Sequence, residues 1–460
     1  MIDEAEVEHD REDDAYILDK RDVAAIRDAV EAHDATRLTE LMAPLHAADI
    51  ADLLEQIDGH ERRALVQLYG HEFDGDILSE LDEGIRDEVI GYLRPEVLAE
   101  AVRELESDDV VDLLEDLDQP QQEAILDALE DADRVAVEQA MSYPEYSAGR
   151  LMQREVVMGP EHWTVGEAID FLRNSKDLPE QFYHLVLVNP RLEPVGYVTL
   201  GRLLSSARDV KLLDIAEDSF RAFEVDEEEG DVAYAFNQYH LISAPVVDST
   251  GRLVGVITID DAMAVLDEEH EEDILRLAGV GEGSLSDKVI ETTKRRLPWL
   301  AVNLVTAILA SMVIAQFEST IAALVSLAVL MPIVASMGGN AGTQALTVAV
   351  RAIATRDLTG SNVWRVIRRE VLVGLANGLI FATVMGIVGF AWFGSPLLGL
   401  VIAFAMVINL VVAGLAGVGI PVVLERFGVD PALASGAFVT TVTDVVGFFA
   451  FLGLAALVLI

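Results

Sequence analysis

The strongest constraint on this chain is an abrupt change of character near residue 290. Beyond it, five apolar runs follow one another, over 298–316, 321–350, 371–393, 397–424 and 432–460. Each run is long enough to cross about 30 Å of hydrocarbon at about 1.5 Å per helical residue. The pattern predicts five membrane-spanning helices and excludes a simple water-soluble enzyme.

Charge divides the chain at the same place. Of the formal net charge of −47, the first 290 residues carry −49 and the rest carry +2. So acidic a chain is not expected to bind nucleic acid, because that requires a basic surface. Arg greatly outnumbers Lys among the few basic residues, and this composition is typical of adaptation to a salt-rich (halophilic) cytoplasm. There is no Cys, so disulfides and cysteine-ligated metals are excluded.

Basic residues also predict the orientation. They occur before the first apolar run, between the second and third, and between the fourth and fifth. The positive-inside rule therefore places the N-terminal half in the cytoplasm and the C-terminus outside, in a multi-pass protein of the cell membrane. The N-terminus lacks the apolar core of a signal peptide. Since five helices are few for a pore, we expect a homodimer with a shared pathway.

One acid lies well inside an apolar run. Asp444 follows Thr440, Thr441 and Thr443 in the last predicted span. A carboxylate in hydrocarbon costs about 3 kcal/mol or more unless it faces water or a cation. We interpret Asp444 as part of an ion pathway; the alternative is a carboxylate bonded to neighbouring hydroxyls or to a helix N-terminus.

The second apolar run contains a polar interruption. Met331 and Pro332 are followed by Gly338, Gly339 and Asn340. Non-helical backbone at membrane depth is tolerated where it lines a watery cavity, so we expect a break whose carbonyls and Asn340 are oxygen ligands. The alternative is close helix packing through small residues. Oxygen ligands suit hard cations such as Mg²⁺, and we expect the other buried amides, Asn409 among them, to form interhelical hydrogen bonds.

Two internal repeats organise the soluble half. The segment 48–58 recurs at 108–118 within a helical pattern, which predicts a helical-repeat superhelix. The segment 188–199 recurs at 247–258 as strand, turn, strand and helix start, which predicts a pair of small α/β modules. No nucleophile–base pair, Walker motif or HExxH sequence is present, so we do not expect an enzyme.

These modules resemble a pair of cystathionine-β-synthase (CBS) domains. The order of helical repeat, CBS pair, connecting helix and five spans resembles the MgtE family of Mg²⁺ channels and transporters. The most specific motifs are 331–344 and 431–444. The fold class implied is a mixed multi-domain membrane protein, with an all-α N domain, an α/β CBS pair and an α-helical membrane domain. The ranges are an acidic tail at 1–15, the helical domain at 16–140, the CBS pair at 141–270, an acidic linker and plug-like helix at 271–297, and five spans at 298–460.

The resemblance implies a homodimeric, Mg²⁺-selective pore that cytoplasmic Mg²⁺ closes. It maps the residue that holds hydrated Mg²⁺ in the pore onto Asp444, with Thr440 in the same run. It maps the break in the second run, also part of the pore, onto Gly338, Gly339 and Asn340. It maps regulatory Mg²⁺ onto Asp108, Asp112, Glu228, Asp261, Glu269, Glu272, Asp273 and Asp430. A solvated acidic face in a salt-adapted protein is the alternative for these acids.

The sequence departs from the family pattern at His240 and Ala264, where acids are expected. CBS modules can also bind ATP or another adenine nucleotide through an Asp three residues after a Thr. Thr258 and Asp261 keep that spacing, whereas the first module has Arg202 there. Two other functions stay open: transport of another divalent cation such as Co²⁺ or Mn²⁺, and a membrane-anchored nucleotide-sensing CBS protein.

Overall fold

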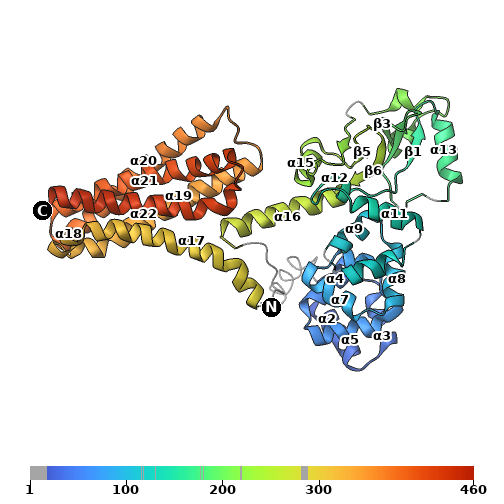
Figure 1. Cartoon of the computed structure of the whole chain (residues 1–460), viewed down its shortest axis with the longest axis horizontal. Coiled ribbons are helices and arrows are strands. Elements are labelled where there is room, and N and C mark those ends of the chain that lie inside the picture. Colours follow the sequence, from blue (N-terminus) through green and yellow to red (C-terminus); the bar gives the residue numbers. More distant parts are fainter. Residues whose placement is uncertain are drawn as a thin grey trace, which may run out of the picture. The chain divides into compact units, whose positions relative to one another are not determined.

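The chain forms two compact units, Met1–Glu269 and His270–Ile460 (Figure 1). The computed structural model describes residues 18–460, apart from 116, 118, 130, 177, 180, 218, 219 and 281–288. The acidic tail expected at 1–15 lies outside the described residues, as does most of the segment in which the plug-like helix was expected to begin. Each unit is described by itself.

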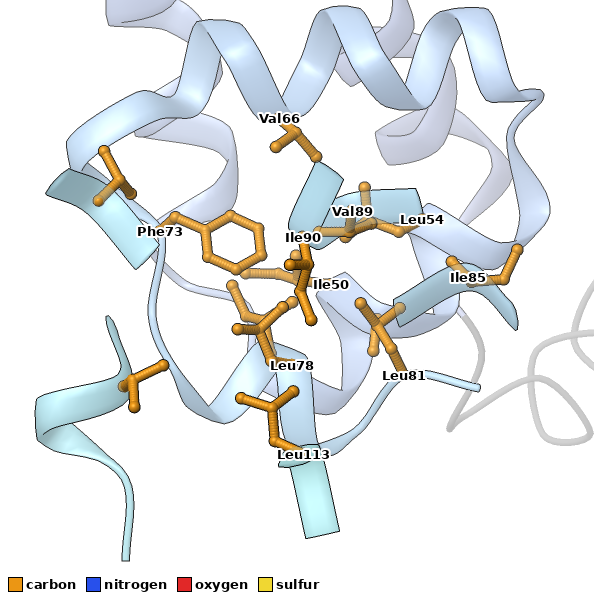
Figure 2. Packing of buried hydrophobic residues seen from close by; sticks show 14 of the residues in the cluster. Ile50, Leu54, Val66, Phe73, Leu78, Leu81, Ile85, Val89, Ile90 and Leu113 are labelled. Carbon is orange, nitrogen blue, oxygen red and sulfur yellow. The ribbon is translucent and has the colours of Figure 1, made fainter. Parts of the chain in front are cut away.

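The first unit begins with a helical region in which short amphipathic helices enclose an apolar core. Its helices are α2 (Lys20–Glu31), α3 (Ala35–Met42), α4 (Ala47–Gln56), α5 (Gly59–Tyr69), η1 (Gly70–Glu72), α6 (Asp76–Ser79), α7 (Glu83–Tyr92), α8 (Pro95–Glu104), α9 (Ser107–Glu115), α10 (Gln119–Leu126) and α11 (Asp131–Ala140). Figure 2 shows apolar side chains from several of these helices meeting in the core, including Ile50, Phe73, Val89 and Leu113. This burial holds together helices too short to be stable alone.

The 60-residue repeat is visible in the hydrogen bonds of this region. The two copies form α4 and α9. After the first copy, Arg62 Nε donates to the carbonyl of Leu54 at 2.7 Å. After the second, Gln122 Nε2 donates to the carbonyl of Leu114 at the same distance. In both copies, therefore, the side chain at the same position of the repeat donates to a carbonyl near the C-terminus of the helix. Such carbonyls have no partner within their own helix.

Two similar α/β modules complete the first unit. The first contains β1 (Met158–Pro160), α13 (Val165–Asn174), β2 (His184–Val188), β3 (Pro194–Thr199), α14 (Leu200–Ser205) and η2 (Leu212–Ile215). Helix α12 (Ala148–Leu151) precedes it along the chain but packs into the core of the second module. The second contains β4 (Phe223–Glu224), α15 (Glu229–Tyr239), β5 (Ser243–Val247), β6 (Leu253–Thr258) and α16 (Ile259–Leu277), which runs on into the second unit.

Each module has a three-stranded sheet with one parallel and one antiparallel pair. In the antiparallel pairs, His184 lies opposite Thr199, and Ser243 lies opposite Thr258. Even the irregularity in the register, after Leu187 in β2 and after Val246 in β5, recurs at the 59-residue offset. The predicted duplication is therefore confirmed in strand order and register.

The second unit is a bundle of long helices. They are α17 (Val289–Gln316), α18 (Glu318–Ala323), α19 (Ser326–Ala354), α20 (Val363–Phe393), α21 (Pro396–Arg426) and α22 (Pro431–Val458). Small residues bring the backbones close. A Cβ atom at Gly374 would lie 2.4 Å from the carbonyl oxygen of Leu410, and one at Gly414 would lie 2.6 Å from that of Glu370. Such contacts drive helix association where the surroundings are apolar.

Four helices of the described chain, not the expected five, are long and apolar enough to cross a membrane by length and composition. They are Thr292–Gln316, Val363–Phe393, Pro396–Arg426 and Gly436–Val458. The run expected at 321–350 is divided between α18 and α19. Helix α19 has 29 residues, but the polar and glycine residues near its centre lower its mean hydropathy. It nevertheless packs along α21 and α22.

The expected break in this run is also absent. Helix α19 is continuous from Ser326 to Ala354 and includes Pro332, Gly338, Gly339 and Asn340. In water, the three glycines and the proline of α19 would weaken a helix. Among packed apolar helices an unpaired backbone group costs more than the low helix propensity of these residues, so the helix persists.

Candidate cation pathway and carboxylate clusters

Asp444 lies mid-way along α22, between neighbouring hydroxyls that are already engaged. Its side chain is half-buried, and no hydrogen bond or ion pair joins it to another described residue. Thr440 Oγ1 donates to the carbonyl of Gly436 at 3.0 Å, and Thr443 Oγ1 donates to that of Val439 at 3.1 Å. The carboxylate is far from a helix N-terminus. Its oxygens therefore stay available to a cation, and the structural alternatives for this acid receive no support.

Gly338 makes room for a buried amide from another helix. Asn409 of α21 is completely buried, and its Nδ2 donates to the carbonyl of Val334 at 2.8 Å. A Cβ atom at Gly338 would lie 2.1 Å from that nitrogen, and one at Gly447 of α22 would lie 2.7 Å from it. Asn409 thus joins α19, α21 and α22, and the predicted interhelical hydrogen bond is present.

The neighbouring polar residues of α19 have open surroundings. A Cβ atom at Gly339 would meet nothing within 4 Å. Asn340 is exposed and donates weakly to Ser336 Oγ at 3.5 Å, while Thr343 Oγ1 donates to the carbonyl of Gly339 at 3.0 Å. Because the helix is continuous, the carbonyls expected to be freed here remain within a helical backbone.

Substitution of the two adjacent glycines separates packing from ligand roles. We expect Gly338→Ala to destabilise the folded protein by about 2–4 kcal/mol, because overpacking displaces Asn409 from its hydrogen bond. Gly339→Ala is the matched control and should change the unfolding temperature little, because the added methyl meets open space. Thermal unfolding of both variants in the same detergent measures the difference. Equal stability of the two would contradict the packing role.

A first group of carboxylates gathers where α9 and α16 begin. Asp108 is buried, and this burial, together with the charges of Asp261, Asp109 and Glu106, raises its pKa well above the usual range. Burial, reinforced by the charge of Asp261, raises the pKa of Asp109 to about 7. Burial likewise raises the pKa of Asp261 to about 6, with Asp260 contributing. The structure thus brings together two of the predicted residues, Asp108 and Asp261.

Neutral hydrogen bonds hold this group together against its own repulsion. Ser107 Oγ donates to Glu155 at 2.8 Å and accepts from the backbone N–H of Arg154 at 2.8 Å. Gln153 Nε2 donates to Glu106. These hydrogen-bonding groups are uncharged, so they position the carboxylates without neutralising them. A bound cation would reduce the repulsion among the carboxylates.

A second group of carboxylates comes from three places: the end of α9, the start of α15 and the middle of α16. Burial, with the charges of Glu268, Glu115, Glu269 and Asp112, raises the pKa of Glu229 to about 7. A Cβ atom at Gly230 would lie 2.8 Å from Glu269 Oε1. Two predicted residues, Asp112 and Glu269, thus lie near Glu229 at the start of α15. Another predicted acid, Glu228, is the N-cap residue of that helix. Asp112 also forms an ion pair with Arg86 at 2.7 Å.

The remaining predicted acids belong to the second unit, where Arg276 organises two of them. Arg276 forms ion pairs with Glu272 at 2.7 Å and with Asp430 at 3.3 Å. Asp430 also caps α22 by accepting from the backbone N–H of Ala432 at 2.7 Å. Asp273 follows Glu272 on α16. Glu272 and Asp430 therefore pair with an arginine that sequence reasoning did not consider.

The two residues predicted to bind a nucleotide, Thr258 and Asp261, also lie side by side. Thr258 Oγ1 donates to Asp261 Oδ2 at 2.7 Å. In the first module, Arg202 takes the place of that Asp; it donates to the carbonyl of Ile215 at 3.1 Å and pairs with Glu217 at 3.6 Å. His240 ends α15 in a left-handed conformation, and Ala264 is exposed on α16.

Sequence reasoning missed Glu106, Asp109, Asp260, Glu115, Glu229 and Glu268. The only available signal was their adjacency to predicted residues, which a sequence rich in acids does not make distinctive. Across the described residues, no three His, Asp or Glu side chains converge as direct ligands of one metal ion. The two groups instead offer separated carboxylates, which suit a cation that keeps part of its water shell, as Mg²⁺ does.

Comparison with known proteins agrees with this arrangement. The MgtE profile, described as a divalent cation transporter, matches residues 331–454. The MgtE intracellular N domain matches 45–146, and the CBS domain matches 148–209 and 222–268.

Complete relatives align over most of their length. A magnesium transporter MgtE of Thermus thermophilus is 31% identical over 449 residues, 96% of this chain and 99% of that protein. A magnesium transporter MgtE of Bacillus subtilis is 30% identical over 381 residues, 83% of this chain and 84% of that protein. The crystal structure of the cytosolic domain of the Mg²⁺ channel MgtE in complex with ATP matches 53% of this chain and 99% of its own, with 28% identity and a TM-score of 0.50. Similarity that spans both units, with the three profiles in the predicted order, establishes that the chain belongs to the MgtE family.

Proposed function

We propose that this protein carries Mg²⁺ across the cell membrane through a pathway that includes Asp444. The observation that carries the proposal is a carboxylate with no hydrogen-bond or ion-pair partner among the described residues, placed mid-way along an apolar helix. The free-energy cost of placing such a carboxylate among apolar helices falls when the carboxylate faces water or a cation. Membership of the family supports Mg²⁺ as cargo, and oxygen ligands without histidine in the helical bundle favour a hard cation.

The architecture of the proposal extends to the whole chain. The helical domain spans 16–140 and the CBS pair spans 141–270. A connecting segment at 271–297 leads to the membrane domain at 298–460. Helix α19 serves as a fifth membrane helix beside the four that qualify by composition. The N-terminal domains lie in the cytoplasm and the C-terminus outside, and two copies form the pore.

Cytoplasmic Mg²⁺ closes this pathway by binding the acidic groups of the soluble domains. Support comes from the gathering of Asp108 with Asp261, where burial raises the pKa of Asp108 well above its usual range. Asp112 and Glu269 lie near Glu229, and their charges help to raise the pKa of that carboxyl. A cation bound between such carboxylates favours the conformation that brings them together. Thr258 and Asp261 offer a site for ATP or a related nucleotide, as in the ATP-bound relative.

Reconstitution in liposomes at high KCl tests the proposal. An internal dye follows Mg²⁺ entry, while Mg²⁺ on the side of the soluble domains is kept low or high. Entry that falls with Mg²⁺ on that side supports both pathway and regulation. Entry of Co²⁺ or Mn²⁺ in place of Mg²⁺ would reassign the cargo, and no cation entry under any condition would favour an anchored nucleotide sensor.

Neutralising three acids together tests the regulation. We expect Glu269→Gln, Glu272→Gln and Asp273→Asn, combined, to keep flux within about two-fold of its maximum at high Mg²⁺, because the closed state loses its cation-dependent stabilisation. The same liposome assay measures this. The combined variant Glu96→Gln, Glu100→Gln and Asp87→Asn, on α7 and α8, is the charge-matched control and should close normally. Normal closure of both variants would remove the three acids from the sensor.

A further inference from the structure

Three arginines share one exposed face at the start of α20. Arg365, Arg368 and Arg369 are spaced so that they lie on one side of the helix, and Leu372 and Val373 continue this face one turn further on. With Ala376, these residues line a surface hollow of about 500 Å³. The hollow is thus basic at one end and apolar at the other.

Nothing in the described chain neutralises or covers this face. No described carboxylate forms an ion pair with any of the three arginines, although the chain has 79 acidic residues. All six lining residues are exposed, whereas Val366 and Ile367 on the opposite face pack against α19 and α21 residues. Within the described residues, the positive charge of this face is therefore left without a complementary group.

The position along α20 places this hollow at a membrane surface. Trp364 and Trp392 are both largely exposed near the two ends of the helix. They lie 28 residues apart, about 42 Å at 1.5 Å per residue, which matches the roughly 40–45 Å of a bilayer with its headgroups. Tryptophan favours such interfaces. The arginines follow Trp364 directly, at headgroup depth, and Leu372 to Ala376 lie where acyl chains begin.

We propose that this hollow binds an anionic phospholipid, with the phosphate on the arginines and an acyl chain along the apolar end. Arginine forms paired hydrogen bonds to phosphate oxygens, so the basic end of the hollow suits a phosphate headgroup. Free phosphate would use the basic end alone and leave Leu372 and Val373 in water. The apolar half of the hollow therefore favours the lipid.

Native mass spectrometry of the full-length protein in detergent tests this. Delipidated protein is titrated with dioleoylphosphatidylglycerol or dioleoylphosphatidylcholine. We expect wild type to retain the anionic lipid at least ten-fold more tightly, and Arg365→Gln, Arg368→Gln and Arg369→Gln combined to lose this preference. The control combines Lys294→Gln, Arg295→Gln and Arg296→Gln, which remove equal charge near the start of another long apolar helix, α17, and should keep the preference.

Several results would overturn the proposal. Equal losses in both triple variants would show general attraction of anionic lipid to basic residues. Displacement of the lipid by millimolar inorganic phosphate would assign the hollow to free phosphate. A change of oligomeric mass in the α20 variant, with lipid retention unchanged, would assign the face to a second copy of the chain. If the glutamine variant does not fold, the triple lysine variant replaces it: it keeps the charge but lacks the planar fork, so undiminished binding would also contradict the proposal.

Discussion

Asp444→Asn should reduce Mg²⁺ flux at least roughly ten-fold while leaving the protein folded. The amide keeps the shape of the carboxylate but cannot offset the charge of the cation. Opposite unit charges 4 Å apart attract by about 4 kcal/mol at an effective dielectric constant of 20, and about 1.4 kcal/mol corresponds to ten-fold. The fold should persist because the carboxylate has no described partner to lose. Dye-based Mg²⁺ entry into liposomes and the unfolding temperature in detergent measure the two effects.

Glu318→Gln is the matched control for this variant. Glu318 is an exposed acid at the start of α18 in the same helical unit. The Glu318→Gln variant should retain wild-type flux, because it removes an exposed charge and leaves the charge of Asp444 in place. Wild-type flux through Asp444→Asn would place the pathway elsewhere, and equal losses in both variants would show a general effect of acidic charge.

Asp261→Asn should stabilise the soluble unit when Mg²⁺ is removed by a chelator. The folded chain raises the pKa of this carboxyl to about 6, so at neutral pH its charge opposes folding by on the order of 2–3 kcal/mol at about 1.4 kcal/mol per pKa unit. The amide removes the charge and still accepts from Thr258. We expect a rise of roughly 5 °C in the unfolding temperature of the soluble unit of the full chain, followed by calorimetry. Added Mg²⁺ should stabilise wild type more than the variant.

The pH dependence gives a second readout of this effect. A carboxyl whose folded pKa is raised stabilises the fold fully below its unfolded pKa, near 4, and this contribution is lost as the pH rises through about 6. In chelator, wild type should therefore lose stability between pH 4 and 7 more steeply than Asp261→Asn. The control Asp112→Asn should instead lose some stability, because Asp112 is exposed and pairs with the nearly buried Arg86. A variant at position 261 less stable than wild type in chelator would contradict the prediction.

Repeated sequence made the soluble architecture predictable. The 59- and 60-residue repeats encode the same local interactions twice, and the structure repeats them down to the register irregularities in β2 and β5. Helix and strand patterns are local properties of the chain, so a repeated pattern signals a repeated fold. The gathering of Asp108 with Asp261 came from the family resemblance instead, because 153 residues separate them and no local pattern joins them.

The interior of the helical bundle was less predictable. Glycine, proline and asparagine in α19 suggest a break when judged by propensity in water, but an apolar environment enforces the helix. The contact between Gly338 and Asn409 depends on which helix faces which, and neither residue signals its partner. The same holds for Glu106 and Glu229, since burial selects a few carboxylates from a large excess.

The junction at Asn409 has a mechanical consequence. The Asn409 side chain of α21 donates to a carbonyl of α19 and fits against a glycine of α19 and a glycine of α22. We therefore expect these three helices to resist sliding past one another and to behave as a rigid frame. Helix α17 lies outside this frame: 6% of its most apolar stretch is buried, against 56% for α21. We therefore expect Asp444, which α22 carries within the frame, to stay fixed in place while a cation passes.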